Sequence, residues 1–303
     1  MGILSINSVE KSFKDKKVVD DLTFSVNNGE IMGMLGPNGA GKTTTIRMIM
    51  DIIEPDRGSI RFSGDGHGTS SKKSIGYLPE ERGLYEDATT GDVLEYLGTL
   101  KGLERRVARD RAIEWLKKMD LGEEVDAKIS ELSKGMAQKV QFIASILHEP
   151  ALAILDEPFA GLDPVNQDLF RELIQELRDK GTTILLSSHR MNMVEELCER
   201  VFMIHRGSEI LYGKLSEIKE DFGKDLVELT YSGDSEAITD TFGKAIQDLD
   251  AGESSARFYI EKGYSPDKFI RELPGEIEVQ EISIRKPPLH DIFVAKAKGG
   301  NDV

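Results

Sequence analysis

Residue types suited to phosphate chemistry stand together in one glycine-rich stretch, Gly36-Pro37-Asn38-Gly39-Ala40-Gly41-Lys42-Thr43. The stretch matches the pattern G-x-x-x-x-G-K-[ST] at every constrained position. Its glycines let the backbone turn tightly, so that successive N–H groups and the start of the next helix point at negative charge. We expect Lys42 to reach the β- and γ-phosphates of a nucleoside triphosphate, and the Thr43 hydroxyl to ligate Mg²⁺. The alternative is an ordinary glycine-rich turn, which does not explain why the glycines, the lysine and the hydroxyl coincide.

The segments on either side of this stretch predict the strand and the helix that the pattern requires. Residues 30–35 form a short apolar run suited to a buried strand. Residues 44–50, which begin with Thr44, have the spacing and length of a helix. We therefore expect the loop to lie between the end of a buried strand and the first turn of a helix.

Two carboxylates follow a second apolar run. Residues 151–155 predict another buried strand, and Asp156 and Glu157 come directly after it. Ligands bind outside the carboxyl ends of the strands in parallel sheets. We expect Asp156 to hold Mg²⁺ through water and Glu157 to act as the general base that polarises the attacking water. Paired acids at a strand end often mark only the start of a loop, but the apolar strand and the glycine-rich stretch favour a site.

Two more positions stand at the ends of predicted elements. Ser133 and Gly135 precede residues 139–147, which have helical spacing. A serine and a glycine at a helix start can offer a hydroxyl, backbone donors and the helix dipole to an anion, although this signal is weak alone. His189 follows a third apolar strand, residues 182–188. A lone histidine is usually structural, yet this one stands at the strand ends where Lys42 and Glu157 are expected.

The remaining elements must build the scaffold around these residues. Thr90 is the expected N-cap of a helix, and about residues 85–147 predict a helical insertion between strands. Phe13 lies between two alternating segments that predict antiparallel strands. It is either a partly buried residue of a strand–loop junction, which the residues alone favour, or a platform on which adenine stacks. The other predicted strands are residues 3–7, 22–26, 59–62, 75–78, 201–207 and 209–213.

The last 84 residues predict a separate, smaller domain of mixed structure. Three alternating segments, residues 227–231, 256–260 and 277–284, predict strands. Residues 236–249 and 266–273 predict helices. We expect a domain boundary at residues 219/220, with a small α/β accessory domain in residues 220–303.

Composition limits the classes of protein that this chain can belong to. The chain has 303 residues with a formal net charge of −15, which argues against gripping nucleic acid through a broad basic surface. Neither a run of about 18 apolar residues nor a signal peptide is evident, so a cytoplasmic protein is expected. The single cysteine, Cys198, cannot form an intrachain disulfide and is expected to be a packed helix residue.

The ordered set of motifs over residues 3–219 resembles the nucleotide-binding subunit of an ABC transporter. The motifs are the phosphate-binding loop, the signature at Leu132–Gln138, the strand that ends at Glu157, the loop at residues 161–163, and His189. The resemblance implies that Phe13 stacks on adenine and that His189 contacts the γ-phosphate of ATP in the same subunit. It also implies that Ser133 and Gly135 contact the γ-phosphate of ATP that a second subunit holds. Asp163 would help to couple the two subunits.

This chain departs from the common family pattern at two places. Its signature reads Leu-Ser-Lys-Gly-Met where the family usually has Leu-Ser-Gly-Gly-Gln, but Ser133 and Gly135 are kept. Glu80 stands where the family usually has glutamine. A carboxylate there can still ligate Mg²⁺ or orient water, and whether Glu80 aids hydrolysis or mainly signals to the membrane subunit stays open.

The sequence therefore predicts an α/β fold: a P-loop NTPase core with an antiparallel β subdomain, a helical insertion and a small C-terminal α/β domain. The segment after Glu80 and the end of the chain resemble ATPases of exporters, including the sodium-efflux and drug-resistance groups. The resemblance implies an ATPase that uses ATP and Mg²⁺, pairs with a second ATPase subunit, and powers a separate permease from the inner face of the membrane. The alternative is a soluble ABC ATPase acting on nucleic acid or ribosomes.

Overall fold

The computed structural model describes residues 2–63, 73–81, 83–261 and 263–299, and it divides the chain into two compact units. The first unit ends at Gly213 and the second begins at Lys214. Among the described residues, no helix is long and apolar enough to cross a membrane. The functional domain boundary predicted at residue 219 stays a prediction.

A six-stranded sheet forms the centre of the first unit, in the order β5-β6-β7-β3-β8-β9. Its strands β3, β5, β6, β7 and β8 pair in parallel. The three middle strands are buried at every residue, as expected for a parallel sheet that is covered on both faces. Because parallel strands end at one edge, the loops that follow β3, β6 and β7 meet there. The bounds are β3 Ile31–Leu35, β5 Ile75–Leu78, β6 Leu152–Asp156, β7 Thr183–Ser188, β8 Arg200–His205 and β9 Ser208–Lys214.

An antiparallel sheet of three strands packs against this central sheet, in the order β2-β1-β4. The strands are β1 Gly2–Phe13, β2 Lys16–Asn27 and β4 Arg57–Phe62. Their apolar side chains belong to one core with the central strands; the rings of Phe24 and Phe202, for example, stack with their centroids 4.2 Å apart. The predicted antiparallel subdomain is thus present, with strands longer than the alternating segments indicated.

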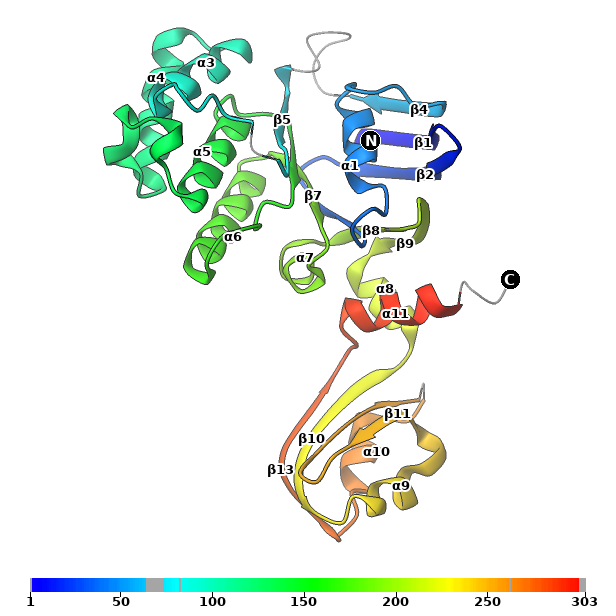
Figure 1. The fold of residues 1–303 in the computed structure, drawn as a ribbon. Coiled ribbons are helices and arrows are strands. Elements are labelled where there is room, and N and C mark those ends of the chain that lie inside the picture. Colours follow the sequence, from blue (N-terminus) through cyan, green and yellow to red (C-terminus); the bar gives the residue numbers. More distant parts are fainter. Residues whose placement is uncertain (1, 64–72, 82, 262, 300–303) are drawn as a thin grey trace. The chain divides into compact units, whose positions relative to one another are not determined.

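Helices connect the parallel strands and build the insertion (Figure 1). Helix α1 (Lys42–Ile49) begins at the glycine-rich loop, and α6 (Pro164–Asp179) and α7 (Met191–Leu197) follow β6 and β7. The insertion contains α3 (Thr90–Leu100), α4 (Arg105–Lys118), two short 3₁₀ turns and α5 (Lys134–Ile146). Figure 1 shows α3, α4 and α5 gathered on one side of the central sheet, with the β2-β1-β4 sheet on the other.

The helix N-cap predicted at Thr90 is wrong by one residue. The N-cap of α3 is Thr89, whose hydroxyl accepts a hydrogen bond from the Asp92 N–H at 3.2 Å. Thr90 is instead the first helical residue, and its buried hydroxyl donates to the Ala127 carbonyl at 3.1 Å. Two adjacent threonines have the same capping chemistry, so tertiary packing decides which of them caps.

The second unit repeats a strand–helix–strand arrangement around an antiparallel sheet. Its strands are β10 (Asp225–Gly233), β11 (Ile246–Ala251), β12 (Ser255–Ile260) and β13 (Ile277–Arg285), in the order β11-β12-β10-β13. With α9 (Glu236–Phe242) and α10 (Pro266–Arg271) this gives the βαββαβ order of a ferredoxin-like fold. Figure 1 shows both helices on one face of the sheet, and α8 (Leu215–Phe222) and α11 (Leu289–Gly299) flank the unit in sequence.

One predicted element of the second unit is wrong. The helix expected over residues 236–249 ends at Phe242, and the rest of that segment forms β11, a strand that the sequence did not predict. Strand β11 carries three polar or acidic side chains among six residues that are mostly exposed, so it shows no alternation of its own. Its pairing with β12 at the sheet edge makes it a strand.

Candidate active site

A cavity of about 330 Å³ lies at the edge where the parallel strands end. It brings together the glycine-rich loop, the end of β5 and the end of β6, as their sequence positions predicted. The residues that line it are Val18, Asn38, Gly39, Gly41, Lys42, Thr43, Thr44, Glu80, Asp156 and Glu157. A cation, three carboxylates and two threonines therefore line one small space.

The backbone of the loop explains why glycine is needed at residue 41. Gly41 has a φ of 114°, and a Cβ there would meet the Val18 carbonyl oxygen at 2.8 Å. A hydrogen bond of 3.0 Å from the Gly207 N–H to the Ala40 carbonyl holds the loop from behind. The Ala40 N–H donates to the Pro37 carbonyl at 3.1 Å, which closes the turn within the loop. Backbone contacts thus fix the shape of the loop.

The Lys42 ammonium is held inside this loop. Its Nζ donates to the Gly36 carbonyl at 2.7 Å and to the Pro37 carbonyl at 3.3 Å. Burial lowers the pKa of Lys42, and the nearby charges of Glu157, Asp156 and Glu80 oppose that shift. The carbonyls are weak partners for a cation, so a phosphate that enters the cavity can replace them.

Thr43 and Asp156 both line the cavity and place side-chain oxygens next to each other. The Thr43 hydroxyl donates to Oδ2 of Asp156 at 3.3 Å, while Oδ1 of Asp156 is buried and has no hydrogen-bond partner in the described structure. Burial raises the pKa of Asp156, and the carboxylates of Glu80 and Glu157 raise it further, whereas the Ser187 and Thr43 hydroxyls oppose that shift. An unpartnered buried oxygen beside a hydroxyl fits a divalent cation, which would supply the missing partner.

The oxygens of Thr43 and Asp156 suit Mg²⁺, which needs few protein ligands, better than a cation that protein side chains alone must surround. Among the described residues, no three or more His, Cys, Asp or Glu side chains form a group that could hold a metal. Mg²⁺ usually keeps several waters and binds one or two protein oxygens together with substrate phosphates. Thr43 and Asp156 are sufficient for that arrangement.

Glu157 is held by the end of the neighbouring strand. Its Oε2 accepts a hydrogen bond from the Ser188 hydroxyl at 3.1 Å, and its Oε1 accepts one from the His189 N–H at 2.9 Å. The His189 ring lies beside the same Oε1, with Nδ1 at 2.8 Å. The Glu157 side chain is 7% exposed, whereas the His189 side chain is 51% exposed. The carboxylate is therefore fixed, and the imidazole is the group that is free to turn away.

Glu80 lies in the cavity with Asp156 and Glu157, on the loop that follows β5. Gln141 of α5 holds this loop, because its Nε2 donates to the Pro79 carbonyl at 3.4 Å and to the Glu81 carbonyl at 3.1 Å. The helical insertion is thus tied directly to the loop that carries the third carboxylate.

The predicted residues Gly36, Pro37, Ala40 and His189 adjoin residues that line this cavity but do not line it themselves, and three further predicted residues lie away from it. Ser133 is the N-cap of α5 and accepts a hydrogen bond from the Met136 N–H at 3.3 Å. A side chain at Gly135 would meet nothing within 4 Å, so this position is open. Phe13 is 48% exposed at the end of β1, with Lys11 Nζ 5.7 Å from its ring centroid. None of the three lines the cavity.

Sequence reasoning missed two residues at the site. Val18 of β2 lines the cavity, and Ser188 holds Glu157. A valine in an alternating strand has no chemical signal of its own. Ser188 could have been found, because it directly precedes His189 at the end of a predicted strand.

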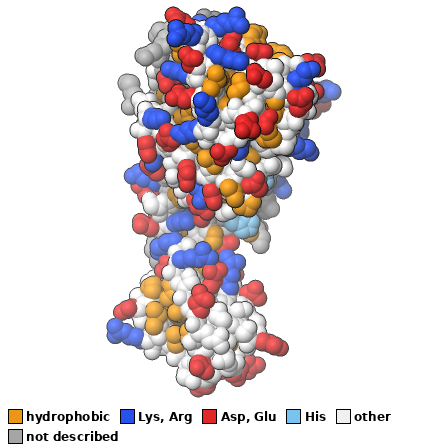
Figure 2. Space-filling view, turned by 90° about the vertical axis from the view of Figure 1, so that its left-hand side faces the viewer, with side chains coloured by type: hydrophobic (Ala, Val, Ile, Leu, Met, Phe, Trp, Pro, Cys, Tyr) orange, Lys and Arg blue, Asp and Glu red, His pale blue; other side chains and the backbone are white. Residues whose placement is uncertain are grey.

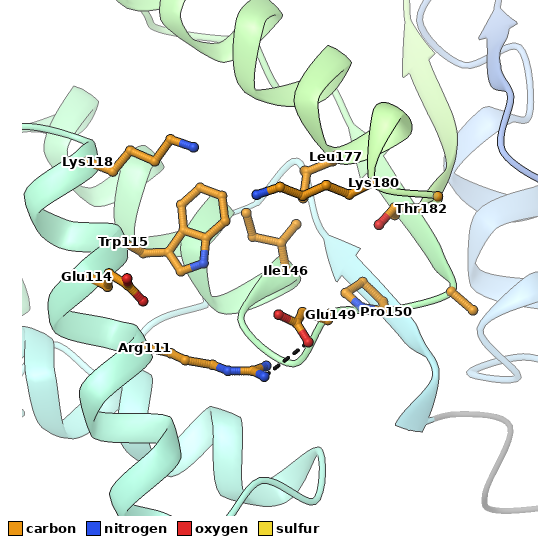
Figure 3. A pocket seen from close by; sticks show the side chains of 12 residues that line it. Arg111, Glu114, Trp115, Lys118, Ile146, Glu149, Pro150, Leu177, Lys180 and Thr182 are labelled. Carbon is orange, nitrogen blue, oxygen red and sulfur yellow. Dashed lines mark ion pairs between the residues drawn. The ribbon is translucent and has the colours of Figure 1, made fainter.

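A larger hollow, of about 640 Å³, lies near the opposite ends of β6 and β7 (Figure 3). Figure 3 shows the Trp115 ring between α4 and the core, with Lys118 and Lys180 on either side of the space above it. Arg111 pairs with Glu149 at 3.0 Å, and both lysines pair with Glu176. Arg111 and Lys118 of the insertion are thus paired with acidic residues outside it, Glu149 and Glu176.

Comparisons with known proteins give consistent matches. A family model described as ABC transporter matches residues 19–160, and a model described as ATP-binding protein DrrA1-3-like, C-terminal domain, matches residues 213–297. The uncharacterized ABC transporter ATP-binding protein YhaQ of Bacillus subtilis (strain 168) is 41% identical, over 97% of this chain and 98% of YhaQ. The linearmycin resistance ATP-binding protein LnrL of the same organism is 32% identical, over 96% of this chain and 97% of LnrL. A solved structure of the ATP-binding subunit of an ABC transporter superposes with a TM-score of 0.68 at 34% identity, over 73% of this chain and 93% of that one.

Proposed function

The chain belongs to the ATP-binding proteins of ABC transporters and is an ATPase, and on this premise we propose that it powers an exporter whose permease is a separate chain. One observation carries the ATP hydrolysis on which this export would depend: Lys42, Thr43, Asp156 and Glu157 line a single cavity at the carboxyl ends of the parallel strands. This is the set that phosphoryl transfer to water needs, namely a phosphate cradle, a cation, a metal ligand and a base.

The proposed reaction uses these side chains in a defined order. The loop N–H groups and Lys42 bind the phosphates, and Thr43 and Asp156 would hold Mg²⁺, which neutralises charge on the β- and γ-phosphates when bound. Glu157 orients a water and accepts its proton as the water oxygen bonds to the γ-phosphorus. The bond from that phosphorus to the bridging oxygen breaks, leaving ADP and inorganic phosphate. His189 leaves Glu157 and donates to the γ-phosphate.

The position of the signature residues supports a paired subunit. Ser133 and Gly135 stand at the start of α5 in the insertion, and neither lines the cavity that contains Lys42. A helix N-terminus with an open glycine is suited to an anion that comes from outside the chain. We infer that these residues complete the cavity of a second copy, which would close on ATP.

Exposed tyrosines on the insertion support a membrane partner. Tyr85 is 57% exposed and Tyr96 is 48% exposed, and their rings lie edge to face with centroids 5.9 Å apart. They line a hollow of about 580 Å³ whose charged residues are the acidic Glu86, Asp87 and Asp92, of which Asp92 is paired with Arg109 at 3.2 Å. Cytoplasmic loops of membrane proteins carry an excess of lysine and arginine, which complements this acidic rim. We infer that a permease docks here and that the chain works at the inner face of the membrane.

The alternative, an ATPase acting on nucleic acid, is less well supported. Figure 2 shows basic and acidic side chains interspersed over the face of the first unit that carries the insertion. A nucleic-acid surface requires clustered positive charge, and the chain has a net charge of −15.

A mixing experiment tests the paired site. Lys42→Ala should weaken ATP binding about 10- to 100-fold, because charge-assisted bonds to the phosphates are lost. Gly135→Asp places a negative charge at an open position, so it should leave the fold intact but repel a γ-phosphate. Each variant alone should hydrolyse ATP poorly, whereas a mixture should regain activity, because one of its two sites then has an intact loop and an intact signature. A mixture no more active than its components would contradict a shared site between two copies.

A further inference from the structure

Ser188 is a buried residue at the end of β7 whose hydroxyl contacts the carboxylate of Glu157. It is 1% exposed, and it does not line the nucleotide cavity. Its Oγ lies 3.1 Å from Oε2 of Glu157. The contact therefore joins two neighbouring parallel strands at the edge where hydrolysis takes place, without approaching the nucleotide.

The direction of the Ser188 hydroxyl proton is fixed by a second hydrogen bond. The Arg190 N–H donates to the same Oγ at 3.0 Å. Because an ionised carboxylate is only an acceptor, the proton of the hydroxyl must point to Glu157. Arg190 is itself anchored, since its Nη2 donates to Oε1 of Gln167 at 3.3 Å. The hydroxyl is thus an oriented donor.

Glu157 needs such an anchor because its backbone adopts an unfavourable conformation. Its φ is 49°, in the left-handed region that non-glycine residues rarely adopt. Two buried or backbone donors, the Ser188 hydroxyl and the His189 N–H, bind one carboxylate oxygen each. The third donor, the His189 ring, is half-exposed and shares Oε1 with the backbone N–H.

We propose that Ser188 is a positioning residue for hydrolysis: together with the His189 N–H it clamps the Glu157 carboxylate. When the His189 ring turns to the γ-phosphate, the clamp stays in place, and the lone pair of Oε1 that the ring releases faces the attacking water. Without the Ser188 hydroxyl the carboxylate rotates, and fewer of its orientations accept the proton of that water. This inference rests on the proposed role of Glu157 as general base.

Ser188→Ala separates positioning from nucleotide binding. We expect kcat to fall about 10- to 100-fold, the range for losing one hydrogen bond to a charged group. The Kd and KM for ATP should stay within about twofold, because Ser188 lies outside the cavity. Ser188→Thr, which keeps the hydroxyl, should restore most of kcat. A kcat of Ser188→Ala within twofold of the unmodified chain would overturn the proposal, and so would an equal loss in Ser188→Thr with unchanged melting temperature.

A matched control and a double variant make the result specific. Ser145→Ala removes another buried serine hydroxyl, one that donates to the Phe142 carbonyl within α5, and should leave kcat unchanged. In the Glu157→Gln background, Ser188→Ala should cause no further loss, because the clamped carboxylate is already absent. A full additional loss would assign Ser188 a role that is independent of Glu157 and contradict the clamp. If Glu157→Gln itself retained full turnover, the general-base assignment would fail instead, so the two failures are distinguishable.

Discussion

The imidazole of His189 rests on the carboxylate of Glu157, with Nδ1 2.8 Å from Oε1. Both residues lie at the carboxyl ends of neighbouring strands, which is why a sequence separation of 32 residues becomes a hydrogen bond. In this arrangement Oε1 accepts from both the His189 N–H and the His189 ring, which occupies both of its lone pairs. The ring must therefore leave before Oε1 accepts a proton from water, whereas Oε2 accepts only from the Ser188 hydroxyl among the described residues.

Replacing His189 tests which of its two contacts hydrolysis depends on, the one with Glu157 or the one proposed with the γ-phosphate. In His189→Ala the Glu157 lone pair is free from the start, but the donor to the γ-phosphate is lost. We expect the second effect to dominate and turnover to fall about 10²-fold, the usual cost of removing one donor to developing charge. Steady-state hydrolysis measures the fall, and ATP affinity should change little. Faster hydrolysis would show that the resting contact, rather than the phosphate contact, is the role of His189.

Glu80 provides a prediction about pH. Burial and the Glu80 and Glu157 carboxylates raise the pKa of Asp156, so Asp156 loses its charge at a higher pH than an ordinary aspartate does. Glu80→Gln removes one of these charges and should lower the pKa of Asp156. Activity at neutral pH should then be similar or higher, and hydrolysis should persist to a lower pH. Rates measured across pH test this, and loss of hydrolysis at neutral pH would show that the Glu80 charge is needed.

The turn between β8 and β9 provides a prediction about the phosphate-binding loop. Gly207 has a φ of 87°, accepts a hydrogen bond from the Asp20 N–H at 2.8 Å, and donates to the Ala40 carbonyl. A Cβ at Gly207 would meet the Val18 carbonyl oxygen at 2.7 Å. Gly207→Ala should therefore displace the loop and weaken ATP binding about tenfold or more, with a loss of about 1–3 kcal/mol in stability.

Gly29→Ala is the matched control for this turn. Gly29 also has a positive φ, 71°, but a Cβ there would meet nothing within 4 Å. It should lose stability through backbone strain alone and keep its ATP affinity. Titration with a fluorescent ATP analogue and thermal unfolding separate the two effects; equal ATP affinities in the two variants would contradict a role for the Gly207 turn in shaping the loop.

The fold could be predicted where burial is continuous or the pattern is local. Strands β3, β6 and β7 are buried along their length and each contains an apolar run, and the glycine-rich loop matches a phosphate-binding pattern, so the strands and their common edge could be predicted from the sequence. Strand β11 and the Thr89 cap could not be predicted, because pairing at a sheet edge and packing against Ala127 decide them.

The candidate site was likewise predictable where its residues belong to a local sequence pattern. Lys42, Thr43, Glu80, Asp156 and Glu157 do line one cavity. Contacts between residues far apart in the sequence were not predictable. Examples are the position of Val18 in the cavity lining and the hydrogen bond from the Ser188 hydroxyl to Glu157. The roles of all these residues stay predictions, and Ser133, Gly135, Phe13 and His189 do not line the cavity of their own chain.

The central claim is that Glu157 is the general base of an ATPase, and its removal is the most direct test. Glu157→Gln keeps the shape of the side chain and its contact with Ser188 but cannot accept the proton. Release of inorganic phosphate, measured beside equilibrium ATP binding, should fall about 10²- to 10⁴-fold while ATP still binds with similar affinity. Turnover equal to that of the unmodified chain would contradict the account.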